Sequence, residues 1–256
     1  MQEAQNKSAE NNEKKAPAAT EKPVLYMIPT VLAAGTEKEV LAPQVEAAIR
    51  STRLFFVENL RTARRFVSKV GHPEVIETLS FYVLDKSTEA KELGDYIALT
   101  KKFGQAGIIS EAGCPGIADP GANLVALAHK RDIHVVPLTG PCSFILALMG
   151  SGLGGQRFAF LGYLPQKEPQ RSAGIKLMEK ESKEKNQTQI FMETPYRNVP
   201  LYAELLKQCH PSTQLCIALD LTAPDAFIRT ATIAEWRKSG FAIPSKVPAV
   251  FVLLSA

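Results

Sequence analysis

The sequence predicts two α/β domains, the first built on a parallel sheet and the second on a mixed sheet. From Val24 onward, short apolar runs alternate with amphipathic segments, which is typical of strands joined by crossover helices. The chain has 256 residues. That length exceeds one ordinary small domain and allows two of roughly 110 to 120 residues, each large enough to bury its own core.

The first domain is expected over residues 23–138. Before it, residues 1–22 carry almost no large apolar side chain, so we expect a disordered tail. Helices are clearest at 87–102 and 121–131, between apolar runs that are typical of buried parallel strands. These runs are 24–28, 53–58, 79–84, 106–110 and 133–138.

The second domain is expected over residues 139–256, beginning near Thr139. The charged segment 167–185 indicates either a solvated helix or a mobile excursion. The last three apolar runs follow one another closely, which favours antiparallel or mixed pairing. Its candidate strands are 158–164, 189–194, 215–221, 226–233 and 249–254.

The composition fits a folded protein of the cytoplasm. Hydrophobic residues make up 45% and charged residues 22%, with a formal net charge of +4. No apolar stretch approaches the roughly 20 residues of a membrane span, and no secretion signal is present. The four cysteines show no CxxC spacing, so neither a disulfide framework nor a metal site is indicated.

The run SEAGCPGIADPG, from Ser110 to Gly121, follows the fourth predicted strand. Ligands of open parallel sheets bind beyond the carboxyl ends of strands. Glycines let a ligand approach the backbone closely, and prolines stiffen the path. We expect Asp119 to cap the next helix, with Pro120 in its first turn. The preceding part is either one wall of a ligand pocket or an elaborate turn.

Two further junctions follow strands. After the fifth strand comes TGPCS, residues 139–143, where a small buried thiol is a better interpretation of Cys142 than a nucleophile. In the second domain, a strand ends at Glu193, close to Arg197 in sequence, and a plain salt bridge is the commoner outcome. The motifs of P-loop ATPases, zinc proteases, serine hydrolases and dinucleotide-binding proteins are missing.

A basic stripe is expected on the helix that follows Asn59. Arg61, Arg64, Arg65 and Lys69 share one face at helical spacing. Such a face either is simply solvated or binds phosphates.

Taken in order, these junctions resemble the tetrapyrrole methylase superfamily of S-adenosylmethionine-dependent methyltransferases. The resemblance is closest to the ribosomal RNA small subunit methyltransferase I family, which methylates a ribose 2′-hydroxyl of 16S rRNA. SEAGCPGIADPG resembles the family pattern SDAGTPxISDPG, and FMETPYR, 191–197, resembles FYESPHR. TGPCS, LDLTA (219–223) and VENLRTARRFV (57–67) also resemble family segments in the same order.

The resemblance implies a homodimer of two-domain chains with the cofactor, S-adenosylmethionine, in the cleft between the domains. Most cofactor contacts would come from backbone groups and shape. Carried onto this sequence, the residues around the cofactor are Pro29, Gly113, Cys114, Pro115, Ile117, Cys142, Ser143, Met192, Leu221 and Pro248.

The sequence departs from the family pattern mainly among polar groups. The family's PIGN is PTVLAAG here, SDAG is SEAG at Glu111, and EDTR is ENLR at Asn59 and Leu60. A ribose hydroxyl must lose a proton, and Glu111 and Glu193 are the candidate general bases. We expect Glu111→Gln to slow methyl transfer while leaving cofactor affinity nearly intact.

Three functions remain open at this point. The chain is an rRNA ribose methyltransferase, a methylase of a tetrapyrrole or another small molecule, or a non-catalytic RNA- or ribosome-binding relative. An RNA acceptor needs phosphate contacts, which would make Arg61, Arg64 and Arg65 RNA-binding residues. The basic stripe favours the first and third functions, and the altered polar segments favour the third over the first.

Overall fold

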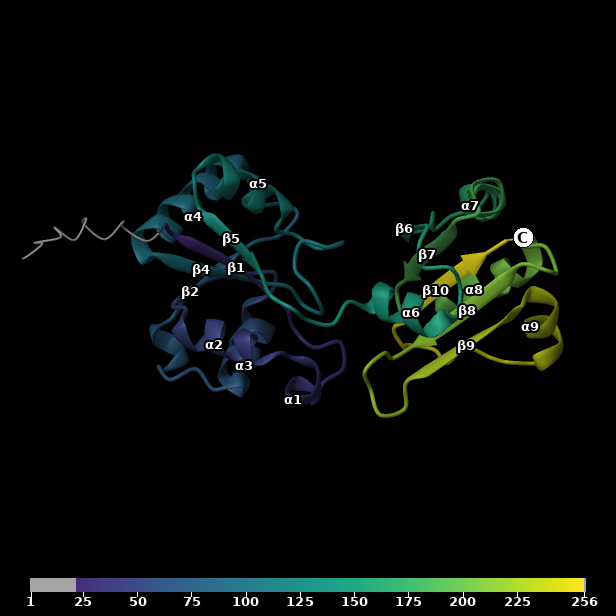
Figure 1. Cartoon of the computed structure of the whole chain (residues 1–256), viewed down its shortest axis with the longest axis horizontal. Coiled ribbons are helices and arrows are strands. Elements are labelled where there is room, and N and C mark those ends of the chain that lie inside the picture. The colour runs from purple at the N-terminus through teal and green to yellow at the C-terminus, as the bar shows by residue number, and fades with distance from the viewer. Residues whose placement is uncertain (1–21, 256) are drawn as a thin grey trace, which may run out of the picture.

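The computed structural model describes residues 22–255, so the expected disordered tail lies outside the described residues except for Lys22. Within this part of the chain, ten strands form two five-stranded sheets. The sheets lie in separate halves of the molecule, each with its own helices (Figure 1). The predicted pair of α/β domains is therefore confirmed.

The first sheet is entirely parallel, as predicted. Its order is β3-β2-β4-β1-β5, with each neighbouring pair parallel. The predicted runs match the strands to within one residue at each end. The strands are β1 (Val24–Ile28), β2 (Leu54–Val57), β3 (Ser80–Val83), β4 (Gln105–Ile109) and β5 (His134–Pro137).

Both faces of the first sheet are covered because its buried strands alternate their side chains. Phe56 packs towards α4 and α5, and its neighbour Phe55 packs towards α2 and α3. Figure 1 shows these helix pairs on opposite sides of the sheet. The helical elements of this half are α1 (Glu37–Val40), α2 (Pro43–Ser51), α3 (Leu60–Val70), a 3-10 turn (Ile76–Thr78), α4 (Ala90–Phe103) and α5 (Ala122–Lys130).

The second sheet is mixed, again as predicted. Its order is β6-β7-β10-β8-β9, and only β6 and β7 run parallel among its neighbouring pairs in the described chain. The predicted ranges agree with the strands to within two residues. The strands are β6 (Phe158–Tyr163), β7 (Thr188–Glu193), β8 (Gln214–Leu219), β9 (Phe227–Thr232) and β10 (Ala249–Leu254).

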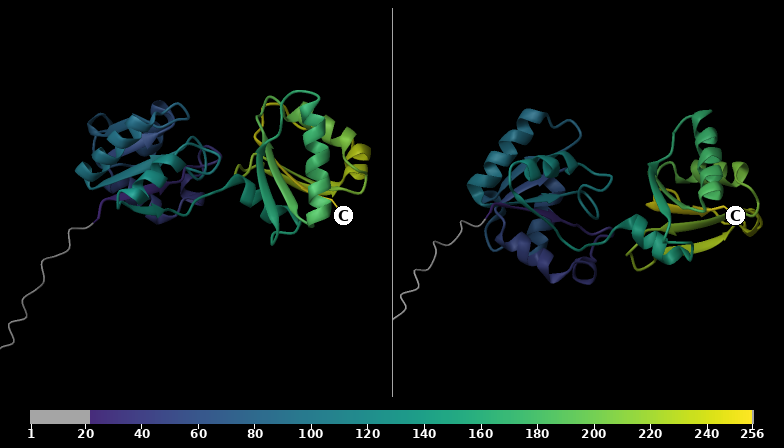
Figure 2. Two further views of the ribbon diagram at one scale, coloured as in Figure 1. Left: turned by 90° about the horizontal axis from the view of Figure 1, so that it is seen from above. Right: turned by 45° about the horizontal axis from the view of Figure 1, so that its top comes forward.

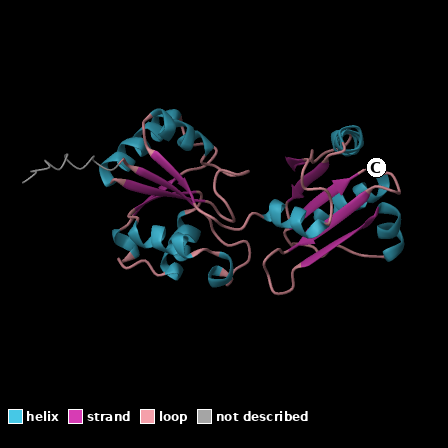
Figure 3. Cartoon of the chain, in the orientation of Figure 1, coloured by secondary structure: helices cyan, strands magenta, loops and turns pink. Residues whose placement is uncertain are grey.

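The helices of the second half divide between the two faces of its sheet (Figure 3). α7, α8 and α9 pack on the face of Phe191 and Phe251, and α6 covers the other face. The charged segment forms a helix, α7, because Ile175 and Met178 bury their side chains against the sheet. The helices are α6 (Ser143–Ser151), α7 (Gln170–Lys185), α8 (Asn198–Gln208) and α9 (Ile233–Ser239).

The two halves face each other across the carboxyl ends of the first sheet. Figure 2 shows the single segment, between β5 and α6, that carries the chain from one half to the other. The loops that follow β1 and β4 therefore face the second half. Between residues 22 and 255, no helix combines the length and the apolarity that a membrane span requires.

Candidate functional site

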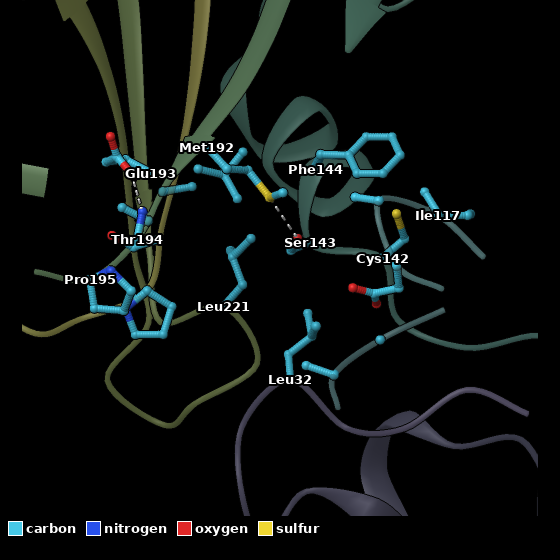
Figure 4. Close-up of a pocket in the computed structure, with 18 of the residues that line it drawn as sticks. Leu32, Ile117, Cys142, Ser143, Phe144, Met192, Glu193, Thr194, Pro195 and Leu221 are labelled. Atoms are coloured by element: carbon cyan, nitrogen blue, oxygen red, sulfur yellow. Dashed lines mark hydrogen bonds between the residues drawn. The ribbon is translucent and has the colours of Figure 1, made fainter. Parts of the chain in front are cut away.

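A cavity of about 340 Å³ lies between the two halves. Loops after β1, β4 and β5 form its wall on one side, and α6 together with the ends of β7, β8 and β10 forms the other. Figure 4 shows Leu32 and Ile117 facing Met192 and Leu221 across it. This inter-domain cavity is the candidate functional site.

Three loops of the first half are fitted closely together at the wall. The Thr30 amide donates to the Gly113 carbonyl at 2.8 Å, and the Cys114 thiol lies 3.4 Å from the Pro141 carbonyl oxygen. Gly113 has φ of +73°, and a Cβ there would lie 3.1 Å from the Pro141 oxygen. The loop from 110 to 117 is thus locked to its neighbours through its backbone, as a rigid binding wall requires.

Most of the predicted cofactor residues lie on this cavity. Pro29 and Pro115 do not line it. Pro29 sits behind the wall, where a Cβ on Gly140 would come within 2.2 Å of the Pro29 Cβ. Those that do line it are Gly113, Cys114, Ile117, Cys142, Ser143, Met192, Leu221 and Pro248.

The wall from the second half starts at the beginning of α6. The Ser143 hydroxyl lies 3.8 Å from the Met192 sulfur, which links α6 to the end of β7 (Figure 4). At the end of β8, Asp220 takes a left-handed φ of +46°, and its amide donates to the Pro248 carbonyl at 3.0 Å. Asp220 lines the cavity with Leu221, so this tight turn brings a second carboxylate, beside that of Glu193, to the wall from the second half.

The two thiols of the cavity are poor nucleophiles. Burial raises the pKa of Cys114 and of Cys142 above the ordinary value. The reactive form of cysteine is the thiolate, and a raised pKa makes it scarcer at neutral pH. The structure agrees with the interpretation of Cys142 as a small, partly buried thiol.

Glu193, a predicted base, lies on the cavity but is already engaged. Its carboxylate accepts from the Arg197 guanidinium at 2.7 and 3.0 Å and from the Thr194 amide at 2.6 Å. The residue is only 5% exposed. The salt bridge that the sequence favoured is present, and it orients the end of β7.

Glu111, the other predicted base, faces a different cavity. Its side chain accepts a hydrogen bond from the Thr62 hydroxyl. Both residues line a hollow of about 270 Å³ between α3 and the loop after β1, together with Arg65 and Lys69. Glu111 does not line the inter-domain cavity, so its catalytic role stays a prediction without a shared location to support it.

The four predicted residues of the basic stripe differ in their surroundings. Lys69 pairs with Glu37 at 2.7 Å, and the Arg64 guanidinium lies 5.5 Å from the centre of the Phe81 ring. Arg61 and Arg65 are exposed, and neither forms an ion pair with any residue of the described chain. These two arginines are the best placed of the four for an anionic partner.

Several polar residues of the cavity were not predicted as part of the site, among them Asp119, Tyr163 and Asp220. Asp119 was expected to cap α5, but the cap is Gly121, two residues later, and it forms no side-chain hydrogen bond. Burial and the charge of nearby Glu58 raise the pKa of Asp119 to about 6. Asp119 follows a glycine- and proline-rich turn, which could have indicated a site residue. The residues Asp119 and Pro120 also fit a helix start, and that interpretation was preferred.

Tyr163 approaches the same region from the second half. It ends β6, and burial raises the pKa of its phenol, with the charges of Asp119 and Glu193 adding to the effect. Groups from both halves therefore influence one another across the cavity, as expected for a site shared between domains.

The chain is similar in sequence to methyltransferases that act on ribosomal RNA by name. A ribosomal RNA small subunit methyltransferase I from Hydrogenobaculum sp. (strain Y04AAS1) is 31% identical over 198 residues, which cover 77% of this chain and 80% of that protein. One of the same name from Buchnera aphidicola subsp. Acyrthosiphon pisum (strain APS) is 28% identical over 218 residues, covering 84% and 73%. No family model matches the chain.

Solved structures share the fold. The structure of the methyltransferase CobJ aligns with a TM-score of 0.59 and covers 92% of this chain and 95% of its own, at 16% identity. At that identity the likeness concerns the fold alone. It extends over both halves, so the fold of two α/β domains recurs in that structure.

Proposed function

This chain belongs to the ribosomal RNA small subunit methyltransferase I family, and from that membership we propose that it methylates a ribose 2′-hydroxyl of 16S rRNA with S-adenosylmethionine. The resemblance seen in the sequence motifs is confirmed at the level of the family. The chain is a methyltransferase, as its relatives and its structural neighbours are.

The observation that carries the proposal is the inter-domain cavity. Eight of the ten residues that the motifs assign to the cofactor line it, and they come from both halves. Its volume of about 340 Å³ falls in the range of small-molecule sites. A nucleoside with a charged amino-acid tail fits a wall of backbone groups and apolar side chains that also carries the carboxylates of Asp119, Glu193 and Asp220.

The cofactor would supply a methyl group already activated by its sulfonium. The chain would then contribute mainly position, because holding an acceptor oxygen in line with an activated carbon supplies several kcal/mol of the barrier. The rigid wall formed by Gly113, Cys114 and Ile117 supports this role. Apolar side chains such as Met192 and Leu221 would exclude water from the reacting groups.

The RNA would be held in part by α3. Arg61 and Arg65 have no ion-pair partner in the described chain, and Arg65 lines the hollow next to the loop that forms the cavity wall. Uncompensated guanidinium groups suit phosphate oxygens. Arg64, which lies on Phe81, would add a weaker contact.

The proposal also covers the domain boundaries, the oligomeric state and the cellular compartment. We assign the first domain to residues 23–138 and the second to 139–256, with the boundary at the segment that leads into α6. A homodimer in the cytoplasm suits an enzyme that acts on ribosomal RNA.

Calorimetric titration with S-adenosylmethionine tests the cofactor site. We expect the wild-type chain to bind and Ile117→Trp to weaken binding at least 10-fold, because Ile117 is 45% exposed at the cavity and an indole there would fill it. Leu177→Trp is the matched control, since Leu177 is 58% exposed on α7, away from the cavity. Failure of the wild-type chain to bind, or equal binding by both variants, would contradict the assignment.

A further inference from the structure

The Asp119 carboxylate does not cap the helix that follows it. The helix after it begins at Ala122 and takes Gly121 as its cap, with φ of +126°. Just before Asp119, Ala118 is held at φ of +64°, an unfavourable backbone conformation for a residue with a side chain. Strain of this kind is typical of functional sites. The chain therefore takes a strained path past Asp119 without gaining a helix cap.

The position of Asp119 joins two cavities. Asp119 and Ala118 line the inter-domain cavity, and both also line a second hollow of about 260 Å³. Its lining combines apolar residues such as Leu84 with polar side chains, among them Asp85, Lys86 and Asn123. A ligand in the first cavity and one in the second would thus meet at the Asp119 segment.

The groups that face Asp119 come from several elements. Glu58 follows β2, Ser110 and Glu111 follow β4, Lys86 follows β3, and Tyr163 ends β6. One carboxylate oxygen of Glu58 is buried and has no hydrogen-bond partner in the described chain. Burial, and after it the charge of Glu58, raise the pKa of Asp119, so its carboxylate is basic enough to take a proton near neutral pH. The hydrogen bond with Ser110 and the charge of Lys86 lower the pKa of Asp119.

We propose that Asp119 is the general base of this methyltransferase and that the acceptor hydroxyl reaches it from the second cavity. The acceptor oxygen bonds to the methyl carbon as the carbon–sulfur bond breaks, and the hydroxyl proton passes to the Asp119 carboxylate. The products are the methyl ether, S-adenosylhomocysteine and a protonated Asp119. Glu58 is a positioning residue that acts through Asp119. This inference rests on the proposed function.

The test is the pH profile of methyl transfer by the whole chain, with small ribosomal subunits and tritiated S-adenosylmethionine. The carboxylate must be ionised to act, so the wild-type rate should rise with pH through about 6 and then level off. Asp119→Asn should lower kcat by about 10² to 10⁴ and remove the rising limb. Glu58→Gln should move that limb to lower pH. Asp95→Asn, an exposed residue of α4, is the matched control and should change neither.

Two readouts do not depend on turnover. Calorimetry should give Asp119→Asn an affinity for S-adenosylmethionine within about 3-fold of wild type, which shows that the variant is folded. In carbon-13 carboxyl NMR, one aspartate should titrate near pH 6 in the free protein and vanish in Asp119→Asn.

The outcomes separate the two proposals. If the wild-type chain methylates subunits and Asp119→Asn keeps its rate and pH profile, Asp119 is not the base and only this inference falls. Loss of the rising limb in Glu111→Gln instead would have the same consequence. If the wild-type chain binds S-adenosylmethionine but methylates no subunit, the proposed function and this inference both fall.

Discussion

Gly140 lies where the chain passes from one domain to the other, and it is packed against Pro29. A Cβ at this position would come within 2.2 Å of the Pro29 Cβ and 2.4 Å of its Cγ. Both atoms belong to a stiff ring in a buried loop, so neither can move aside easily. The contact holds the loop after β1 against the segment that leads to α6, on the inner side of the cavity wall.

We expect Gly140→Ala to destabilise the protein by about 1 to 3 kcal/mol, the usual cost of forcing an extra carbon into a packed site. Gly94→Ala is the matched control. Gly94 is exposed in α4, with nothing within 4 Å of the added Cβ, so alanine should stabilise the helix by about 0.5 to 1 kcal/mol. Urea unfolding of both variants measures the difference. Equal stabilities would show that the contact between Gly140 and Pro29 is not tight.

At the scale of elements, α3 shows how a departure from the family pattern can leave the structure intact. Asn59 stands where the pattern has aspartate, and its side chain accepts from the Arg61 amide at 2.9 Å and the Thr62 amide at 3.4 Å. Asparagine and aspartate are comparable helix caps. The helix begins at Leu60, directly after this cap, so the change from aspartate leaves its start intact.

The arginines of α3 give a prediction for RNA binding. Replacing Arg61 and Arg65 together by alanine should weaken binding of 16S rRNA and reduce the slope of log K against log salt by about 1.4 to 1.8, or 0.7 to 0.9 per lost phosphate contact. Replacing Lys69, which is paired with Glu37, is the control and should change the slope less. Fluorescence anisotropy over a salt series measures it. An unchanged slope in the double variant would mean that this face is only solvated.

Elements were predicted well where one physical signal dominated. The parallel strands consist of buried apolar runs. The bounds of β2 and β4 were predicted to within one residue because short, continuous apolar runs are typical of such strands. The prediction that Asp119 caps α5 was wrong. Asp119 and Pro120 form a good local start signal, but the positive φ values at Gly116, Ala118 and Gly121 carry the chain through an extra turn first. Local capping rules cannot anticipate a path set by contacts with another loop.

The functional site, like the elements, was predicted only in part. Glycine and proline spacing predicted the wall at Gly113 to Ile117, because the backbone conformation of such a loop depends mainly on its local sequence. The side chains that meet across the domains were not predictable. Glu111 follows β4 in the same loop as Gly113, yet its side chain accepts a hydrogen bond from Thr62 in another hollow. Tyr163 lines the same cavity as Asp119 although it belongs to the other domain. Which carboxylate faces which hollow depends on tertiary packing.

For the whole molecule, the main feature is that the site is divided between two sheets. Each sheet has its own core, and the cavity lies between loops of the first half and the start of α6 with the strand ends of the second. Such inter-domain clefts can bind a small cofactor while leaving one side open to a large acceptor. The arrangement suits methyl transfer to an RNA embedded in a ribosomal subunit.

The most direct test of this account is transfer of tritium from methyl-labelled S-adenosylmethionine to small ribosomal subunits that lack the modification. The labelled RNA is then digested to nucleosides. The account predicts label in 16S rRNA, on a ribose 2′-oxygen, with close to one methyl group per subunit at completion. Unlabelled rRNA from a chain that binds S-adenosylmethionine, or label on a base, would contradict it.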